Sequence, residues 1–519
     1  MAASSILAVI VVAALAAPGT EENGVGPFES LARLTPQGPV DELVFARLEK
    51  LGIPPARLCS DAVFLRRVYL DAIGTLPTAA EARAFLADQD PQKRRALVDR
   101  LLERDEFADY WAMKWSNLLR IKAEFPINLW PNAAQAYHRW IRTSLKDNLP
   151  YDQFVRQLLT ANGSNFRVPQ VNFYRAMQSR QPQGIAQTVA LTFMGARAER
   201  WPKERLSGMA GFFSRLSYKS TAEWKEEIVY FDPGQAVAPA VFPDGAPARL
   251  SPDEDPRAAF ADWLIAPGNE WFARNIVNRV WAWLLGRGII HEPDDIRPDN
   301  PAANPELLAY LERELRAAHY DLKHVYRLIL NSQTYQLSSI ARSATPEAAV
   351  QFARYPLRRL EAEVLIDALC QITGTTERYT SAIPEPYTFI PDNQRSIALP
   401  DGSITSSFLE QFGRPSRDTG LESERNNRLT ADQRLHLLNS THVRRKIEQG
   451  PNLQALAQSA NSPSELVDAL YLTILSRLPT AEEAKIIGAS KQPRRGKARA
   501  APGDLVWALI NSSEFLYRH

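Results

Sequence analysis

The sequence predicts a mostly α-helical protein with two helical lobes. A short β or irregular linker joins the lobes, and the second lobe carries a long irregular segment. Through most of the chain, apolar residues recur at steps of three and four, the period of a helix with one buried face. Strand patterns are short and few, and two stretches rich in Pro and Gly break the helical period.

The helical period locates the expected elements in order along the chain. In the first lobe it predicts helices at 63–73, 81–87, 95–102, 134–144 and 151–159. In the second lobe it predicts helices at 258–264, 276–285, 305–315, 322–330, 360–369 and 466–475. Short β-branched or aromatic runs predict strands at 227–231, 387–390 and 396–399.

These elements suggest a division of the chain into domains. We expect a signal peptide at 1–17, a first helical domain at 36–215, a linker at 216–250 and a second helical domain at 251–519. The second domain has an irregular insert at about 373–427, where Pro and Gly are frequent and the helical period fades.

The first residues resemble an export signal. Ile6 to Ala17 is an unbroken apolar run, too short to span a bilayer, and Ala14-Leu15-Ala16 fits the small-x-small cleavage pattern. No Lys or Arg precedes the run, so an uncleaved anchor or a wrongly chosen start codon stays open. The pattern predicts export to the periplasm or cell surface, with no membrane association after cleavage.

Charge and cysteine content exclude several function classes. Lys and Arg total 61 and Asp and Glu total 59, a net charge of +2, so no single-sign field points to nucleic acid. Cys59 and Cys370 are the two cysteines; a disulfide is possible, but buried free thiols are favoured. Without a Cys-x-x-Cys-His motif, the chain is not expected to carry a covalently attached haem, and no cofactor is predicted.

The two ends of the chain share a repeat. Residues 69–82 match residues 471–484, and in each copy a Leu-Pro-Thr sequence ends one helix and starts another. Thr78 and Thr480 are expected N-caps, with Glu81 and Glu483 three residues later completing a capping box. The repeat predicts two similar helix–turn–helix modules and carries no chemistry.

Several longer motifs resemble a known family. Residues 64–78 and 150–155 are similar to the first of two paired domains of unknown function, which often follow a planctomycete-type cytochrome c domain. The second domain of the pair is recognised in motifs at 272–281, 286–288, 294–297, 304–308, 358–363 and 412–415. The resemblance runs from about Leu43 to the end of the chain.

The departures from this family pattern bear on function. Relatives usually have Cys-x-x-Cys-His after a Leu-Thr-Phe-x-Gly segment, but residues 196–203 contain neither Cys nor His. Relatives also have Cys-Glu-Cys-Glu-Arg where residues 421–425 read Leu-Glu-Ser-Glu-Arg. The resemblance therefore implies a member that has lost the family's cysteine motifs, and it does not assign haem to this chain.

One candidate site lies in the irregular insert. Glu422 and Glu424 are two residues apart and could share a cation or a proton, which suits paired-carboxylate chemistry. The favoured alternative is an ion-pair network with Arg425 and Arg414 that holds the loop in place.

The second candidate is the acidic segment at 291–300. Asp294, Asp295 and Asp299 supply the oxygen ligands that calcium prefers, although their spacing matches no EF-hand. The same side chains could instead turn the chain by bonding to its backbone. Asp294 and Asp295 are also catalytic candidates beside Glu422 and Glu424.

A third group of polar residues falls on one expected helix. Asn275, Asn278 and Arg279 lie near one face of an otherwise apolar helix, so they form a buried network or line a cleft; the network is favoured. No His-Glu-x-x-His, Gly-x-Ser-x-Gly or phosphate-binding loop is present, which excludes the enzyme classes that carry those motifs.

Three functions remain compatible with the sequence. The first is an exported non-redox protein that is a binding or scaffold component of an envelope or surface system, with an unknown protein or a surface polysaccharide as partner. The first alternative is a carboxylate-based hydrolase acting on polysaccharide. The second is an electron-transfer accessory, as the resemblance to haem-bearing relatives implies. Substrate, metal dependence and oligomeric state stay open.

Overall fold

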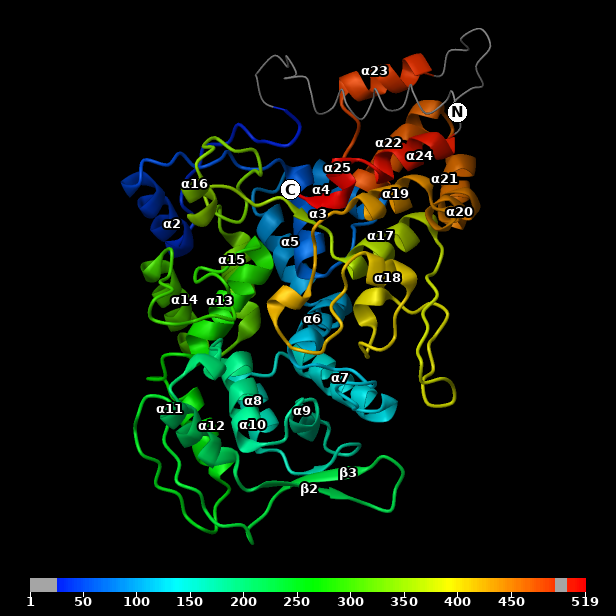
Figure 1. Cartoon of the computed structure of the whole chain (residues 1–519). Helices are drawn as coiled ribbons and strands as arrows, with labels where there is room; N and C mark the ends of the chain where they lie inside the picture. The colour runs from blue at the N-terminus through cyan, green and yellow to red at the C-terminus, as the bar shows by residue number, and fades with distance from the viewer. Residues whose placement is uncertain (1–25, 491–501) are drawn as a thin grey trace.

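A computed structural model describes residues 26–490 and 502–519 (Figure 1). Helices far outnumber strands, so the mostly α prediction is confirmed. The predicted signal peptide lies outside the described residues. Among the described residues, no helix has the length and apolar content needed to cross a bilayer.

The first helices pack around a core that contains two tryptophans of α6. They are α2 (Pro39–Lys50), α3 (Asp61–Ala72), α4 (Ala79–Ala87), α5 (Lys93–Leu102), α6 (Asp105–Leu118), α7 (Pro131–Lys146) and α8 (Tyr151–Thr160). Trp111 and Trp115 are each 1% exposed, and their ring centroids lie 5.4 and 6.0 Å from that of Trp283. Core packing, rather than exposure, is therefore the role of both tryptophans.

A small sheet and short helices form the lower part of Figure 1. The helical elements are α9 (Asn172–Arg175), α10 (Pro182–Val189), a π-helical turn (Ala190–Met194), α11 (Lys203–Ala210) and α12 (Pro256–Ile265). The strands are β1 (Gly163–Ser164), β2 (Leu216–Ser220) and β3 (Glu227–Phe231), in antiparallel order β1-β3-β2. The strand predicted at 227–231 is confirmed as β3, which pairs Val229 with Tyr218.

The remaining helices complete the fold. They are α13 (Phe272–Leu285), α14 (Pro305–Ala317), α15 (Leu322–Asn331), α16 (Pro346–Val350), α17 (Ala362–Thr373), α18 (Ser407–Gln411), α19 (Ala431–Asn439), α20 (Thr441–Gln449), α21 (Pro451–Ser459), α22 (Pro463–Leu475), α23 (Ala481–Ser490), α24 (Pro502–Ile510) and α25 (Ser513–Leu516). A second small sheet pairs β4 (Arg358–Arg359) with β5 (Tyr517–Arg518).

Two of the predicted strands are wrong. Ser396–Ala398 is a 3₁₀ turn, because the amides of Ser396 and Ile397 donate to the two carboxylate oxygens of Asp367, at 2.7 and 3.1 Å. Residues 387–390 are also not a strand, since the amides of Tyr387 and Thr388 both donate to the carbonyl of Pro384 and close a turn. In each segment the backbone amides donate to a local acceptor, so they are not available to pair with a neighbouring strand.

The two ends of the chain pack together. The Arg66 guanidinium on α3 donates to the carbonyls of Ile474 and Phe515, at 2.8 and 3.0 Å. Figure 1 shows α3 and α4 beside α22 and α25. The division into two lobes stays a prediction, but α4 from the first module and α22 from the last one are in contact.

The cysteines are free thiols. Cys59 is buried and Cys370 is partly buried, and no disulfide joins them. Burial raises the pKa of the Cys370 thiol to about 11, so it is protonated at neutral pH.

Candidate functional site

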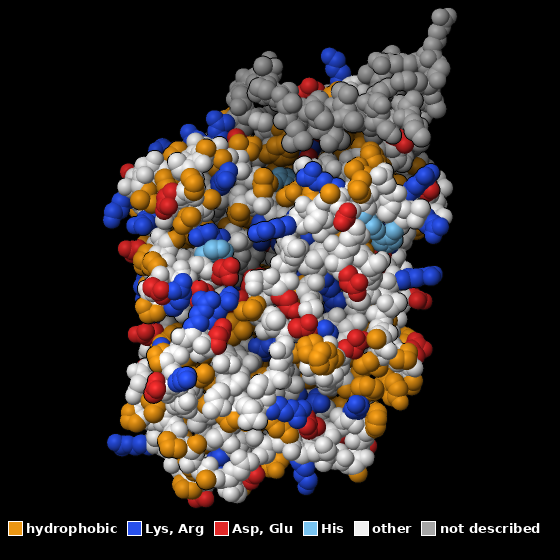
Figure 2. Space-filling model, in the orientation of Figure 1, with side chains coloured by type: hydrophobic (Ala, Val, Ile, Leu, Met, Phe, Trp, Pro, Cys, Tyr) orange, Lys and Arg blue, Asp and Glu red, His pale blue; other side chains and the backbone are white. Residues whose placement is uncertain are grey.

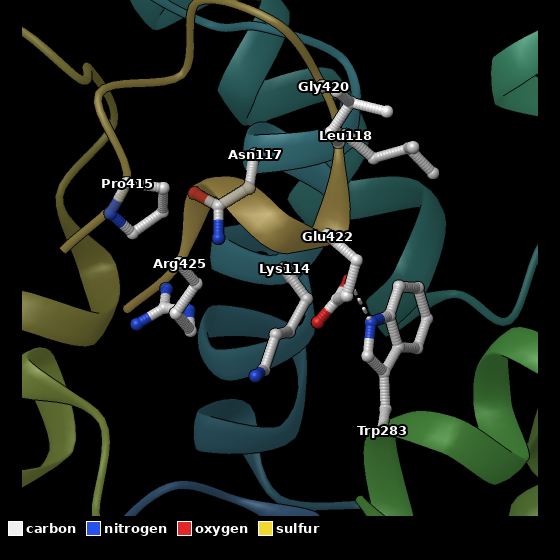
Figure 3. A pocket seen from close by; sticks show the side chains of 9 residues that line it. Lys114, Asn117, Leu118, Trp283, Pro415, Gly420, Glu422 and Arg425 are labelled. Carbon is white, nitrogen blue, oxygen red and sulfur yellow. Dashed lines mark hydrogen bonds between the residues drawn. The ribbon is translucent and has the colours of Figure 1, made fainter. Parts of the chain in front are cut away.

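A polar pocket forms where α6, α13 and the segment around 415–425 meet (Figure 3). Its empty volume is about 310 Å³, counting the open mouth. Lys114 and Asn117 come from successive turns of α6, and Trp283 comes from the last turn of α13. Figure 3 shows the Lys114 side chain lying between Arg425 and Glu422, with its ammonium below both of them.

A buried ionic network supports the floor of this pocket. Lys114 pairs with Glu361, which also accepts hydrogen bonds from Tyr110 Oη at 3.0 Å and Arg518 at 2.9 Å. Burial alone would raise the pKa of Glu361, but Arg518, Lys114 and Arg425 together hold that pKa well below its usual range. Glu361 is therefore an anion that fixes its cations, and it is not a proton donor.

A second carboxylate fixes Arg425. Glu363 accepts two hydrogen bonds from the Arg425 guanidinium, at 2.7 and 2.9 Å, and Arg414 lies 3.8 Å away. Burial opposes ionisation, but the two arginines lower the pKa of Glu363 to about 2. Arg425 therefore pairs with Glu363, a carboxylate of α17 that lies outside the charged motif at 421–425.

Of the carboxylates proposed from the sequence, Glu422 reaches the pocket. The Trp283 indole donates to Glu422 Oε2 at 3.1 Å, and the Glu422 amide donates to Asp294 Oδ2 at 2.7 Å. Asp294 in turn pairs with Arg279 at 2.8 Å, and both side chains are 1% exposed. Asp294 and Arg279 thus form a buried support behind Glu422.

The other acidic candidates lie away from the pocket. Glu424 accepts bonds from the amides of Asp418 and Thr419 and from the Ser416 hydroxyl, which fixes its own loop. Asp295 pairs with Arg200 at 3.2 Å and with Arg297 at 3.1 Å.

Asp299 also belongs to this surface ion-pair cluster, because it too pairs with Arg297. Among the residues that the structure describes, no group of three or more His, Cys, Asp and Glu side chains could hold a metal ion. The proposed oxygen-ligand site at 294–299 stays a hypothesis, and its carboxylates are already bound to arginine.

The polar residues of α13 are internal braces. Asn275 donates to the Thr192 carbonyl at 3.0 Å. Asn278 exchanges two hydrogen bonds with the backbone of Ile290, at 3.0 and 2.8 Å. They fasten α13 to the segments on either side of it, as expected for buried polar groups.

The segments around Thr192 and Thr419, which are far apart in the sequence, lie near each other. The Arg120 guanidinium donates to the carbonyl of Thr419 at 3.1 Å and to the Thr192 hydroxyl at 3.4 Å. Gly195 accepts a hydrogen bond from the Ile296 amide at 2.8 Å, next to Asp294. The segments at 192–195, 294–296 and 419–422 therefore lie close together in space, which the sequence did not reveal.

A second, larger hollow lies between α11, α12 and the start of α13. We call it the aromatic groove; its empty volume is about 1540 Å³, counting its open side, and its lining includes Arg205, Phe242, Trp263, Asn269 and Trp271. Sequence reasoning missed this site. The tryptophans on either side of the Pro-Gly turn at 267–268 are the signal that could have identified it.

The rings of the aromatic groove form a continuous row. Phe242 stacks on Trp263 with centroids 5.3 Å apart, and Trp263 lies 5.8 Å from Trp271. The Arg205 guanidinium lies 4.2 Å from the Trp201 ring centroid and 5.7 Å from that of Trp271. Burial lowers the pKa of the Arg205 guanidinium.

Polar groups edge this row of rings. Glu204, Asp244 and Glu270 are exposed along the groove, and Asp244 accepts a hydrogen bond from the Trp263 indole at 2.9 Å. Asn269 accepts bonds from the amides of Trp271 and Phe272, at 2.9 and 3.0 Å, which fixes the turn that presents Trp271. The groove thus combines partly exposed ring surfaces with carboxylate acceptors.

Comparison with known families gives two matches. Residues 39–201 match PSCyt2, a protein of unknown function (DUF1549), and residues 256–490 match PSD1, a protein of unknown function (DUF1553). No curated protein and no solved structure shows significant similarity to the chain.

Proposed function

Because this chain carries the paired PSCyt2 and PSD1 domains of unknown function, we propose that it is an exported, non-redox binding component of an envelope or surface system. In this proposal it binds a polysaccharide in the aromatic groove. The apolar run and small-x-small pattern at 1–17 support export. The row of partly exposed rings beside carboxylates is the observation that supports sugar binding.

The chemistry of the groove suits a sugar polymer. Sugar rings have apolar C–H faces and polar edges, so they pack on aromatic rings while their hydroxyls reach hydrogen-bonding groups. Trp263 and Trp271 supply the ring surface, and Glu204, Asp244 and Glu270 supply acceptors at the edge. An open groove, unlike a closed cavity, also lets a long chain pass through.

The alternative of a carboxylate hydrolase has less support. Glycosidases hold two carboxyl groups about 5–9.5 Å apart across the bond that they cleave. In the polar pocket, Glu422 is the single carboxylate among the lining residues. Asp294 lies behind it in a buried ion pair, and Glu424 holds its own loop.

Substitutions in the groove test the proposal. Trp263→Leu and Trp271→Leu should each weaken polysaccharide binding at least about tenfold, which is roughly 1.4 kcal/mol. The test uses the polysaccharide that the wild type binds most tightly. Affinity electrophoresis in gels containing neutral, acidic or amino-sugar polymers would measure the binding.

Phe389→Leu is the matched control, because Phe389 is an aromatic side chain that is 68% exposed and lies outside the groove lining. Its binding should equal that of the wild type. Wild-type protein that binds none of the polymers would refute the proposal. Groove variants that remain folded by circular dichroism and bind normally would also refute it.

A further inference from the structure

Three aromatic side chains from separate segments meet on the surface. Trp130 lies at the start of α7, Trp224 lies in the β2–β3 turn, and Tyr387 lies in the irregular insert. The ring centroid of Trp130 is 6.3 Å from that of Trp224 and 5.2 Å from that of Tyr387, at interplanar angles of 86° and 62°. We call this group the aromatic cage, because its rings stand at steep angles and do not form a flat surface.

The cage is open to solvent. Trp224 is 68% exposed and Tyr387 is 45% exposed. Figure 2 shows hydrophobic side chains gathered at the right-hand edge of the lower half, where Figure 1 places the loop that carries Tyr387. Large aromatic side chains grouped at the surface usually mark a binding site.

A cation already lies against two of the three rings of the cage. The Lys225 ammonium lies 5.0 Å from the ring centroid of Trp130 and 5.1 Å from that of Trp224. Within the described residues, no carboxylate forms a salt bridge with Lys225. The electron-rich ring faces are therefore the main attraction for this ammonium group.

The backbone is unusual on both sides of this contact. Trp130 has φ 71° and Lys225 has φ 60°, values that side-chain-bearing residues rarely adopt. Such conformations persist when the surroundings hold them, and they gather at ligand-binding sites. Here they bring the Trp130 ring and the Lys225 ammonium together.

We propose that the aromatic cage binds a small quaternary ammonium compound and that Lys225 is an internal occupant which the ligand displaces. A trimethylated nitrogen spreads its charge over methyl groups that contact ring faces, and it is less strongly hydrated than a primary ammonium. Lys225 is thus a weak competitor, and its position in the exposed β2–β3 turn lets the side chain move into solvent. This site is independent of the aromatic groove.

Choline and its uncharged carbon isostere, 3,3-dimethylbutan-1-ol, test the proposal on the full-length protein. Choline should change tryptophan fluorescence in a saturable way, and the isostere should bind at least about tenfold more weakly, because it lacks the charge that the rings attract. Equal responses to the two compounds would overturn the proposal.

Variants of the cage provide the second test. Lys225→Ala should bind choline about two- to fivefold more tightly, since the competing ammonium is gone. Trp224→Leu should abolish the binding of choline in isothermal titration calorimetry, a measurement that does not depend on the removed ring. Lys219→Ala is the matched control, because it removes an exposed cation from β2 of the same hairpin; it should titrate like the wild type.

Failure of Lys225→Ala to bind choline would overturn the proposal, whatever the wild type does. A separate experiment measures binding of the protein to phosphatidylcholine vesicles by co-sedimentation. Binding to the vesicles without binding to free choline would also overturn it, because the proposed ligand is the small free compound.

Discussion

At the residue scale, the buried charges are the most informative feature. Glu361, Glu363 and Asp71 are each nearly or fully buried, and each meets at least one arginine or lysine. Asp71 also accepts hydrogen bonds from the hydroxyls of Tyr335 and Tyr355, at 2.9 and 2.8 Å. Because a buried charge without partners is very unfavourable, these groups fix the positions of the elements that carry them.

Glu363 gives a prediction about pH. Its pKa is about 2 in the folded protein against 4.5 for an ordinary glutamate, since Arg425 and Arg414 outweigh the effect of burial. The folded state therefore gains stability from the ionised form above about pH 4.5, and loses that gain as the pH falls toward 2. The loss should be about 3 kcal/mol between pH 5 and pH 2.

Urea unfolding at a series of pH values measures this loss. Glu363→Gln should flatten the dependence, because the variant has no carboxylate to protonate. Glu448→Gln removes an exposed partner of Arg444 and should keep the wild-type slope. If the free energy of unfolding of Glu363→Gln depends on pH as in the wild type, another group controls the loss of stability at acid pH.

At the element scale, local sequence signals set where helices start. Thr78 forms a full capping box with Glu81, in which the Glu81 amide donates to the Thr78 hydroxyl at 3.2 Å and the Thr78 amide donates to Glu81. The second copy is the same, with Thr480 and Glu483 exchanging bonds of 2.8 and 3.2 Å. Both capping boxes predicted from the repeat are confirmed.

Removing a cap should destabilise the protein. Thr78→Ala should lower the free energy of unfolding by about 1 kcal/mol, because the Glu81 amide loses its acceptor, the Thr78 hydroxyl. Thr345→Ala is a close control: Thr345 is also an N-cap residue, but its side chain makes no capping bond. Chemical denaturation should show almost no change for Thr345→Ala, and equal losses for the two variants would contradict the role of the cap.

At the scale of the whole molecule, the chain closes on itself. The Arg66 guanidinium on α3 lies over the Phe515 ring, with the centroid 5.4 Å away, and donates to two carbonyls near the C-terminus. Arg518, in the last strand, reaches back to Asp71 at 3.3 Å. These contacts couple the first helices to the last ones, so both ends should unfold together.

Arg66→Met tests this coupling. The two carbonyls would lose a buried donor, and the free energy of unfolding should fall by about 2–4 kcal/mol. Thermal unfolding should remain one transition in circular dichroism and tryptophan fluorescence. Arg444→Met removes an arginine side chain that is 73% exposed, and it should lower the free energy of unfolding by less than about 0.5 kcal/mol. Two separate transitions in Arg66→Met would mean that the ends fold independently.

The candidate site could be predicted in part. Glu422 and Arg425 were identified from a charged motif in the sequence, and both line the polar pocket. Lys114 and Trp283 were missed, because each lies in an apolar helical pattern that resembles ordinary core. Nothing local in the sequence distinguishes a lysine that meets Glu361 from one that extends into solvent.

Acidic residues that are neighbours in the sequence lie in different places in the structure. Glu424 lies two residues from Glu422, and Asp295 is adjacent to Asp294, yet one member of each pair is near the pocket and the other is not. In irregular backbone, successive side chains point in directions that no fixed period predicts. For this reason the acidic motifs suggested carboxylate pairs that the fold does not form.

The sequence by itself determined the helical class, the two capping boxes of the repeat, β3 and the match to the paired domains, because helical period, capping and motif spacing depend on residues close together along the chain. The tertiary structure alone decided which charges pair and where rings gather. Lys114 and Glu361 are 247 positions apart, and the aromatic cage draws on three distant segments. Such contacts depend on how helices pack, which is a property of the whole buried core.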